Sequence, residues 1–321
     1  MSGGFRPRRM TQGHRGTVTM EQSRYSSVPS LLDAYPPWGP RQVHRLPEGV
    51  ASEPYKRFDL TPMTAVIGAE ITGIDLATPL TDELHADVHR ALLEWKVLVF
   101  VGQNLPSEGV HRFAAQWGEP YDAQLRPQGD VVTTVPVPAA GNQNYWHADD
   151  TYMARPGMGS VLRIVEVPAV GGDTVFADMG AAYDNLDPEM QARIDRLRAV
   201  HDCVPYALAT PHYREHIAEI AARFPPVEHP VVRTHPESGR KTLFVNAMWT
   251  KRIVGLSPAE SNGLLLRLCL QATVPEYQCR IRWTPDRVIF WDNRAVQHYA
   301  VSDYSEPRVM VRTTLRGDKP Y

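Results

Sequence analysis

The sequence predicts a mainly β fold with flanking helices, in which two packed sheets form a jelly roll. Short runs rich in β-branched residues recur along the second half of the chain, at 159–167, 173–177, 241–246, 279–284, 287–292 and 307–315. Fewer segments show helical periodicity, and they do not alternate one-for-one with these runs, which disfavours a doubly wound sheet. Many short strands with helices attached to them are typical of a two-sheet jelly roll.

The first 57 residues are predicted to form a flexible extension rich in Arg and Pro. Residues 1–50 contain seven Arg against three acids, and prolines interrupt the segment throughout. No helical or strand periodicity emerges there, as is typical of a loosely ordered terminus. Regular strand and helix patterns begin at Phe58, so we expect one folded domain over 58–321.

The elements of this domain follow in order along the chain. Residues 64–76 predict two short paired strands joined by a Gly turn. Helices are expected over 81–96, 107–117, 187–197 and 257–273. Thr81, Asp187 and Ser257 are the expected caps, with Pro188 in the first turn of the third helix. The apolar run 97–101 reads as a buried strand.

Composition argues against several classes of protein. The formal net charge is −2, with no long cluster of Lys and Arg, so a nucleic-acid partner is not expected. No apolar run reaches the length of about 20 residues that a spanning helix needs, so no membrane partner is expected either. The three cysteines are widely spaced, which favours free thiols in a cytoplasmic protein.

The stretch "NQNYWHADDTY", residues 142–152, holds the first candidate metal ligands. If it is extended, His147 and Asp149 point to the same side. His298, just past an apolar strand, is the best candidate for a third ligand. Two His and one carboxylate form the facial triad of non-haem Fe(II) oxygenases. Zinc remains an alternative, although the chain lacks the H-E-x-x-H pattern of many zinc hydrolases.

Two arginines follow His298 on one predicted strand. Arg308 and Arg312 are four residues apart and therefore share a strand face. Two guanidinium groups near a metal suit a cosubstrate that carries carboxylates. Thr174, after the Gly-rich turn "GGDT", could add a hydroxyl. The alternative is an ordinary strand with arginines facing solvent.

Together these segments resemble the taurine dioxygenase-like Fe(II)/2-oxoglutarate-dependent dioxygenases. The resemblance covers about residues 58–321. It rests on "WHADDTY", "GGDTVFADMGAAY", "HPVVRTHPESGRKTLFVN", "WDNRAVQHYAVSDY" and "RVMVRTTLRGDKPY". It implies a double-stranded β-helix core, and an enzyme that uses Fe(II), 2-oxoglutarate and O2 and releases succinate and CO2. A homo-oligomer is a weaker implication.

The resemblance also implies roles for individual residues. His147, Asp149 and His298 would be the iron ligands. Thr174 and Arg308 would hold the distal carboxylate of 2-oxoglutarate. Arg312 would touch the C1 carboxylate of 2-oxoglutarate or an anionic group of the substrate.

The substrate itself stays open, although it is expected to be a small, anionic or amino-acid-like organic molecule. Tyr145, Asp150, Trp249 and Arg312 are the candidate substrate contacts. Asp150 could receive an amine or hydroxyl, or be a solvated loop acid, and Trp249 could be a core aromatic. Ala123 stands where taurine-using members carry a substrate-binding histidine, which counts against taurine. Hydroxylation is the leading expectation. Cleavage of a sulfonate, sulfate ester or aryl ether, and a catalytically silent binding protein, are the alternatives.

Overall fold

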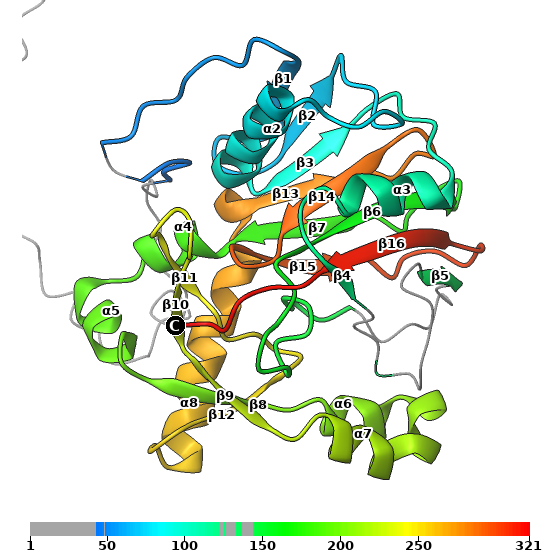
Figure 1. Cartoon of the computed structure of the whole chain (residues 1–321). Coiled ribbons are helices and arrows are strands. Elements are labelled where there is room, and N and C mark those ends of the chain that lie inside the picture. The colour runs from blue at the N-terminus through cyan, green and yellow to red at the C-terminus, as the bar shows by residue number, and fades with distance from the viewer. Residues whose placement is uncertain (1–42, 48, 122–124, 126–132, 137–143) are drawn as a thin grey trace, which may run out of the picture. The chain divides into compact units, whose positions relative to one another are not determined.

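The computed structural model describes residues 43–47, 49–121, 125, 133–136 and 144–321 (Figure 1). These residues belong to one compact unit that spans 41–321. Most of the predicted N-terminal extension, residues 1–57, therefore lies outside the described residues. Its last part does not stand free, because Arg45, Ser52 and Tyr55 all donate hydrogen bonds to the buried carboxylate of Glu94.

The largest sheet has the strand order β1-β2-β3-β14-β6-β16-β4, with β5 also paired to β16 (Figure 1). Its neighbours are antiparallel except for β2 and β3. The strands are β1 (Asp59–Pro62), β2 (Ala69–Thr72), β3 (Val97–Phe100), β4 (Pro120–Tyr121), β5 (Thr133–Pro136), β6 (Gly159–Glu166), β14 (Val288–Asp292) and β16 (Val309–Leu315).

A second sheet faces the first across a shared apolar core. It has the order β13-β7-β15 and is antiparallel throughout. Its strands are β7 (Thr174–Asp178), β13 (Gln278–Ile281) and β15 (Val296–Ala300). Side chains alternate along a strand, so Ile289 and Trp291 of β14 point into this core, where they meet Phe176 of β7 and Ile281 of β13.

Helices cover the other face of the large sheet. Val288 and Phe290 of β14 point that way and pack against α2 (Asp82–Trp95) and α3 (Ser107–Ala114) (Figure 1). Thr81 accepts a hydrogen bond from the Leu84 amide and so caps α2, as predicted. The large sheet is therefore covered on both faces, which explains why β3 and β14 are buried along their whole length.

The remaining elements form a third packed region. It contains the small sheets β12-β8-β9 and β10-β11. Its members are α4 (Met179–Asp184), α5 (Pro188–Ile194), β8 (Arg198–His201), α6 (Val204–Ala209), η2 (Pro211–His216), α7 (Ile217–Arg223), β9 (Val227–Pro230), β10 (Val232–Thr234), β11 (Lys241–Leu243), β12 (Thr250–Ile253), α8 (Pro258–Cys269), η3 (Leu270–Thr273) and η4 (Pro275–Tyr277).

The prediction of a mainly β fold with flanking helices is confirmed. Each of the predicted β-branched runs contains a strand, and the caps Asp187 and Ser257 stand where they were expected. The prediction that residues 64–76 contain both strands of a pair was wrong for one of the two strands. β2 pairs with the upstream β1, and Gly68, at φ +83°, closes the connection between them. Helix α3 ends at Ala114 rather than 117.

Within the described residues, none of the helices combines the length and the apolar character that crossing a membrane requires.

Candidate metal centre

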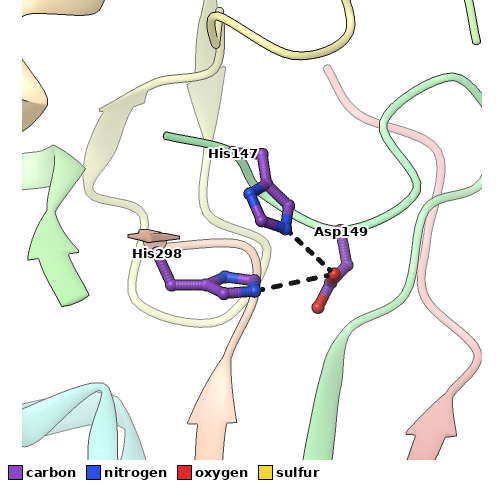
Figure 2. Close-up of side chains that lie close together, drawn as sticks. All are labelled: His147, Asp149 and His298. Carbon is purple, nitrogen blue, oxygen red and sulfur yellow. Dashed lines mark ion pairs between the residues drawn. The ribbon is translucent and has the colours of Figure 1, made fainter. Parts of the chain in front are cut away.

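Three side chains from two distant parts of the sequence meet between the sheets. His147 and His298 form an isolated antiparallel bridge, in which each amide donates to the other's carbonyl at 3.1 and 2.7 Å. Figure 2 shows both rings directed at the Asp149 carboxylate, whose Oδ1 lies 3.8 Å from His147 Nε2 and 3.7 Å from His298 Nε2. All three side chains are buried. The structure thus brings together the three predicted ligands.

Protonation at this cluster suits metal binding. The Nδ1–H of His147 donates to the Tyr145 carbonyl at 2.7 Å, which leaves the Nε2 lone pair free. Burial lowers the pKa of His147, and burial together with the neighbouring His147 lowers the pKa of His298 to about 3. Burial alone would raise the pKa of Asp149, but Arg312 and the two imidazoles bring it down to about 2. Near neutral pH the cluster therefore offers two neutral imidazoles and one carboxylate.

These donors fit a non-haem iron. The candidate ligand atoms lie within 4.8 Å of one another, and this is the one such cluster of His, Cys, Asp or Glu in the described part of the chain. Two imidazole nitrogens and one carboxylate oxygen on one side of a metal leave the other positions open for small ligands. The residues that could hold Fe(II) are therefore His147, Asp149 and His298.

Asn293 holds the backbone of Asp149 and was not singled out from the sequence. It lies in the turn between β14 and β15 and is buried. Its Oδ1 accepts a hydrogen bond from the Asp149 amide at 2.7 Å. Its Nδ2 donates to the carbonyls of Asp149 and Gly157 at 3.0 and 3.1 Å. Its place in "WDNRAVQH", beside the strand of His298, was the only signal in the sequence.

Arg312 pairs with the metal cluster itself. Its Nη2 donates to Asp149 Oδ2 at 2.5 Å and to Ser160 Oγ at 2.9 Å. Burial would lower the pKa of this guanidinium, but Asp149 and Asp150 keep it above the usual arginine value. The guanidinium thus lies against the carboxylate of Asp149, one of the three predicted metal ligands.

Arg308 lies immediately before β16, four residues ahead of Arg312, and contacts Thr174. Its Nη2 is 3.4 Å from Thr174 Oγ1, and the same hydroxyl accepts a hydrogen bond from Trp283 Nε1 at 3.0 Å. Arg308 is only 3% exposed, and among the described residues no carboxylate lies within ion-pair distance of it. Burial lowers the pKa of its guanidinium. A buried charge without a counter-ion is costly, so this site is suited to an anionic ligand.

Asp150 is not the solvated loop acid that was one alternative. It is 8% exposed, and its carboxylate accepts hydrogen bonds from Tyr121 at 3.0 Å and Tyr152 at 3.1 Å. Its backbone has φ 57°, the left-handed conformation that turns the chain away after Asp149. Burial and the neighbouring Asp149 raise the pKa of Asp150 to about 7.

The other substrate candidates differ in exposure. Tyr145 is 52% exposed and touches the cluster through its carbonyl, which orients His147. Trp249 is buried and packs edge-on against Tyr152 and Tyr206, as the core-aromatic alternative anticipated. Its indole Nε1 has no partner among the described residues. Ala123 lies outside the described residues.

A mainly β fold that buries two histidines and one carboxylate in this way is the arrangement of a non-haem iron oxygenase. Comparison with known proteins makes the assignment specific. Residues 57–314 match the family described as taurine catabolism dioxygenase TauD, TfdA family. The chain belongs to this family.

Several characterised relatives match over most of their length. An alkylsulfatase of Acinetobacter baylyi is 35% identical, with 83% of this chain and 87% of the relative covered. An alpha-ketoglutarate-dependent sulfate ester dioxygenase of Pseudomonas putida is 37% identical, with 82% and 91% covered. An (S)-phenoxypropionate/alpha-ketoglutarate-dioxygenase of Sphingobium herbicidovorans is 36% identical, with 81% and 96% covered.

Solved structures agree with this assignment. A taurine dioxygenase from Burkholderia xenovorans superposes with a TM-score of 0.71 at 36% identity, covering 83% of this chain and 93% of that one. AAD-2 in complex with Mn(II) and N-oxalylglycine gives 0.72 at 31% identity, covering 82% and 98%. The predicted enzyme class, a 2-oxoglutarate-dependent dioxygenase that uses Fe(II) and O2, is therefore confirmed.

Proposed function

We propose that His147, Asp149 and His298 hold Fe(II), and that Arg308 and Thr174 hold the distal carboxylate of 2-oxoglutarate. The observation that carries the second assignment is the buried guanidinium of Arg308, which no described carboxylate neutralises. A dicarboxylate that chelates the metal at one end would bring its other carboxylate to this arginine. Charge pairing and the Thr174 hydroxyl would then offset the cost of burying both charges.

Bound Fe(II) would supply the activation of O2 that couples conversion of 2-oxoglutarate to succinate and CO2 with oxidation of the substrate. The residues of this chain orient and enclose the reactants. Arg312, which holds Asp149 Oδ2, leaves Oδ1 directed at the two histidines. From there Arg312 would also meet the C1 carboxylate of 2-oxoglutarate or an anionic group of the substrate.

The proposed reaction is oxidation, most simply hydroxylation, of a small organic substrate that is anionic or amino-acid-like. Relatives named for sulfate esters and phenoxypropionate favour a second form of the same chemistry. Hydroxylation of a carbon bonded to an ester or ether oxygen gives a hemiacetal-like product, which breaks down and releases sulfate or a phenol. Hydroxylation and cleavage are then outcomes of one reaction on different substrates.

Asp150, Tyr145 and Trp249 are proposed to contact this substrate beside Arg312. Asp150 lies next to the ligand Asp149, and its buried carboxylate could receive an amine or hydroxyl in exchange for a tyrosine hydroxyl. The unpartnered indole N–H of Trp249 could donate to an acceptor on the substrate. An intact donor cluster and both arginines argue against a silent binding protein.

Three further proposals concern the whole chain. The two facing sheets support a double-stranded β-helix core, with the metal ligands between them. The family match begins at residue 57, which supports a dioxygenase domain over 58–321 after an extension of residues 1–57, whose last part packs on that domain through Glu94. A cytoplasmic location is supported by the free cysteines, and a homo-oligomer remains a proposal without a described interface.

The decisive experiment is an anaerobic titration of metal-free protein with Fe(II) and then 2-oxoglutarate. Chelation of the iron by the keto acid should produce a visible charge-transfer band. Absence of the band from folded protein would refute the assignment of iron and cosubstrate. His298→Ala should abolish both the band and succinate formation while the protein stays folded, whereas full retained turnover would refute that ligand.

The substrate class is tested by succinate formation in air with matched compounds. The panel contains an alkyl sulfate, a phenoxyacetate, taurine and an amino acid. Release of sulfate or phenol in step with succinate would support the cleaving form. Stimulation by the amino acid alone, lost in Asp150→Asn, would support the amine-bearing class.

A further inference from the structure

We infer that Asn293 is a positioning residue that holds the Asp149 ligand in place relative to the two histidines. This inference rests on the proposed function, because it assigns a role toward the metal that the cluster would bind. It concerns the backbone contacts of Asp149, which none of the roles described above explains.

The bridge between His147 and His298 is a single hydrogen-bonded pair of the kind found in an antiparallel strand ladder. If that ladder continued, the next pair exchanging hydrogen bonds would be Asp149 and Val296. The chain does not continue as a strand. Asp150 adopts φ 57°, and the Met153 amide closes a turn onto the Asp150 carbonyl. The backbone of Asp149 therefore has to find partners elsewhere.

The side-chain amide of Asn293 replaces the backbone hydrogen bonds that Asp149 would have made to Val296 in a continued strand pair. It accepts from the Asp149 N–H at 2.7 Å and donates to the Asp149 C=O at 3.0 Å, so both backbone groups of the ligand residue are satisfied. A third bond, from Nδ2 to the Gly157 carbonyl at 3.1 Å, ties the end of the same loop. Asn293 is 2% exposed, so water does not compete for these bonds.

The turn that carries Asn293 is itself fixed on both sides. Asp292 accepts hydrogen bonds from His235 Nε2 at 2.9 Å and from Arg294 Nη2 at 2.7 Å. His298 follows on β15, the strand that leaves this turn. The turn from β14 to β15, together with β15 itself, therefore supports all three proposed ligands. It carries His298, holds His147 through the backbone bridge, and holds Asp149 through Asn293.

The chain offers a matched control in Gln103. Its amide makes the same set of bonds at a site without ligands, accepting from the Leu76 amide at 3.0 Å and donating to the Ile74 and Val101 carbonyls at 2.8 and 3.1 Å. It is also buried, at 5% exposure. Gln103→Ala and Asn293→Ala should thus cost comparable stability, and only Asn293→Ala should disturb the metal ligands.

The test is a titration of metal-free protein with Mn(II). Binding is measured from the loss of the electron paramagnetic resonance signal of free Mn(II). Partners behind a ligand are typically worth about 10- to 100-fold in metal affinity. We expect Asn293→Ala to weaken binding by that amount, and Gln103→Ala by less than about twofold. Equal affinity of the two variants, with the wild type binding Mn(II), would overturn the inference and leave the proposed function standing. A wild type that does not bind Mn(II) would refute both.

A second measurement covers the case in which Asn293→Ala does not fold. In the metal-free wild type, the Asp149 amide should exchange with solvent slowly, because Asn293 Oδ1 accepts its proton. The near-isosteric Asn293→Asp keeps the acceptor and removes both donors. It should retain slow exchange at Asp149 and still bind Mn(II) more weakly than wild type. Fast exchange at Asp149 in the wild type would contradict the inference without any variant.

Discussion

Arg308 and Arg312 stand four residues apart, the first just before β16 and the second within it, yet their surroundings differ. Arg312 has its acid within the protein, since it donates to Asp149 Oδ2 at 2.5 Å. Arg308 is buried against Thr174, with aromatic rings of Trp283 and Tyr304 nearby, and no carboxylate of the described residues lies within ion-pair distance of it. The same residue type is therefore satisfied by the fold in one place and left without an anion in the other.

The difference indicates two roles. Arg312 stabilises the position of Asp149, whereas Arg308 is available to bind an anionic ligand. A buried ion pair that the fold completes stabilises one arrangement of Asp149, the proposed ligand, and removing one partner leaves a buried charge alone. A buried arginine without a counter-ion lowers stability until an anion arrives, and its cost is recovered on binding. The two arginines should consequently respond in opposite directions to the same substitution.

The largest expected effect is on stability in the absence of ligands. Arg312→Met should lower the free energy of unfolding by about 3 kcal/mol, because Asp149 would be left buried without its partner. Arg308→Met should leave it unchanged or raise it by about 1 kcal/mol, since it removes an unneutralised charge. Denaturant unfolding of the metal-free proteins measures both.

Arg316→Met is the surface control for this pair of variants. Arg316 pairs with exposed Glu119 just beyond the end of β16, and its loss should change stability by less than about 0.5 kcal/mol. Equal losses in Arg308→Met and Arg312→Met would mean that both arginines are structural, and the comparison would fail.

The next effect is on cosubstrate affinity. Arg308→Ala should raise the apparent dissociation constant of 2-oxoglutarate by about 100-fold, equivalent to about 2.7 kcal/mol, because the distal carboxylate would lose its charge partner. Mn(II) affinity should not change, since Arg308 does not contact the cluster. Anaerobic titration of the Mn(II)-loaded variant measures it, and an unchanged dissociation constant would remove Arg308 from the site.

A smaller effect is expected from changing the geometry while keeping the charge. Arg308→Lys retains a cation but not the planar set of donors that matches a carboxylate. We expect 2-oxoglutarate binding to weaken by about 10-fold, between wild type and Arg308→Ala. A loss as large as that of Arg308→Ala would show that the fork geometry, rather than the charge, dominates.

The smallest expected effect is the pH dependence of stability. It gives the pH range in which the pair of Asp149 with Arg312 contributes fully. The pKa of Asp149 is about 2, so its pair with Arg312 contributes fully above pH 4 and weakens only as pH falls toward 2. Burial lowers the pKa of His229 to about 4 in the folded protein, so as the pH falls this histidine is protonated first in the unfolded state. Proton uptake by the unfolded state lowers the free energy of unfolding by about 1 kcal/mol between pH 7 and pH 5.5.

His229→Gln should therefore flatten the loss of stability between pH 7 and pH 5.5. Arg308→Met keeps the pair of Asp149 with Arg312, so the difference in unfolding free energy between this variant and the wild type should stay constant over the same range. Unfolding curves collected at both pH values test both statements. A difference that changes between pH 7 and pH 5.5 would show that replacing Arg308 alters a group that titrates in this range.

The comparison also shows which parts of the site the sequence could predict. His147 and Asp149, two apart, and Arg308 and Arg312, four apart, carry local spacings that fix a shared direction once a strand is assumed. Caps such as Thr81 and Ser257 are equally local. These features were predicted from the residue order alone.

Three other features that depend on contacts between distant segments were not predicted. Asn293 reaches Asp149 across 144 positions, and an asparagine in a turn looks the same whether or not it holds a ligand. The burial of Asp150 depends on Tyr121, which comes from another strand. The partner of β2 was missed because β1 is exposed and carries little apolar periodicity. No local pattern encodes such pairings.

Strand β16 has one more consequence, which concerns the order of events during synthesis. It lies in the interior of the largest sheet, between β6 and β4, although residues 309–315 follow every other described strand in the sequence. Translation delivers His147 and Asp149 long before His298, Arg308 and Arg312. A nascent chain that still lacks residues 298–315 would hold two of the three proposed metal ligands and leave an open gap beside β6. The proposed iron site would accordingly be complete only after these last segments are synthesised.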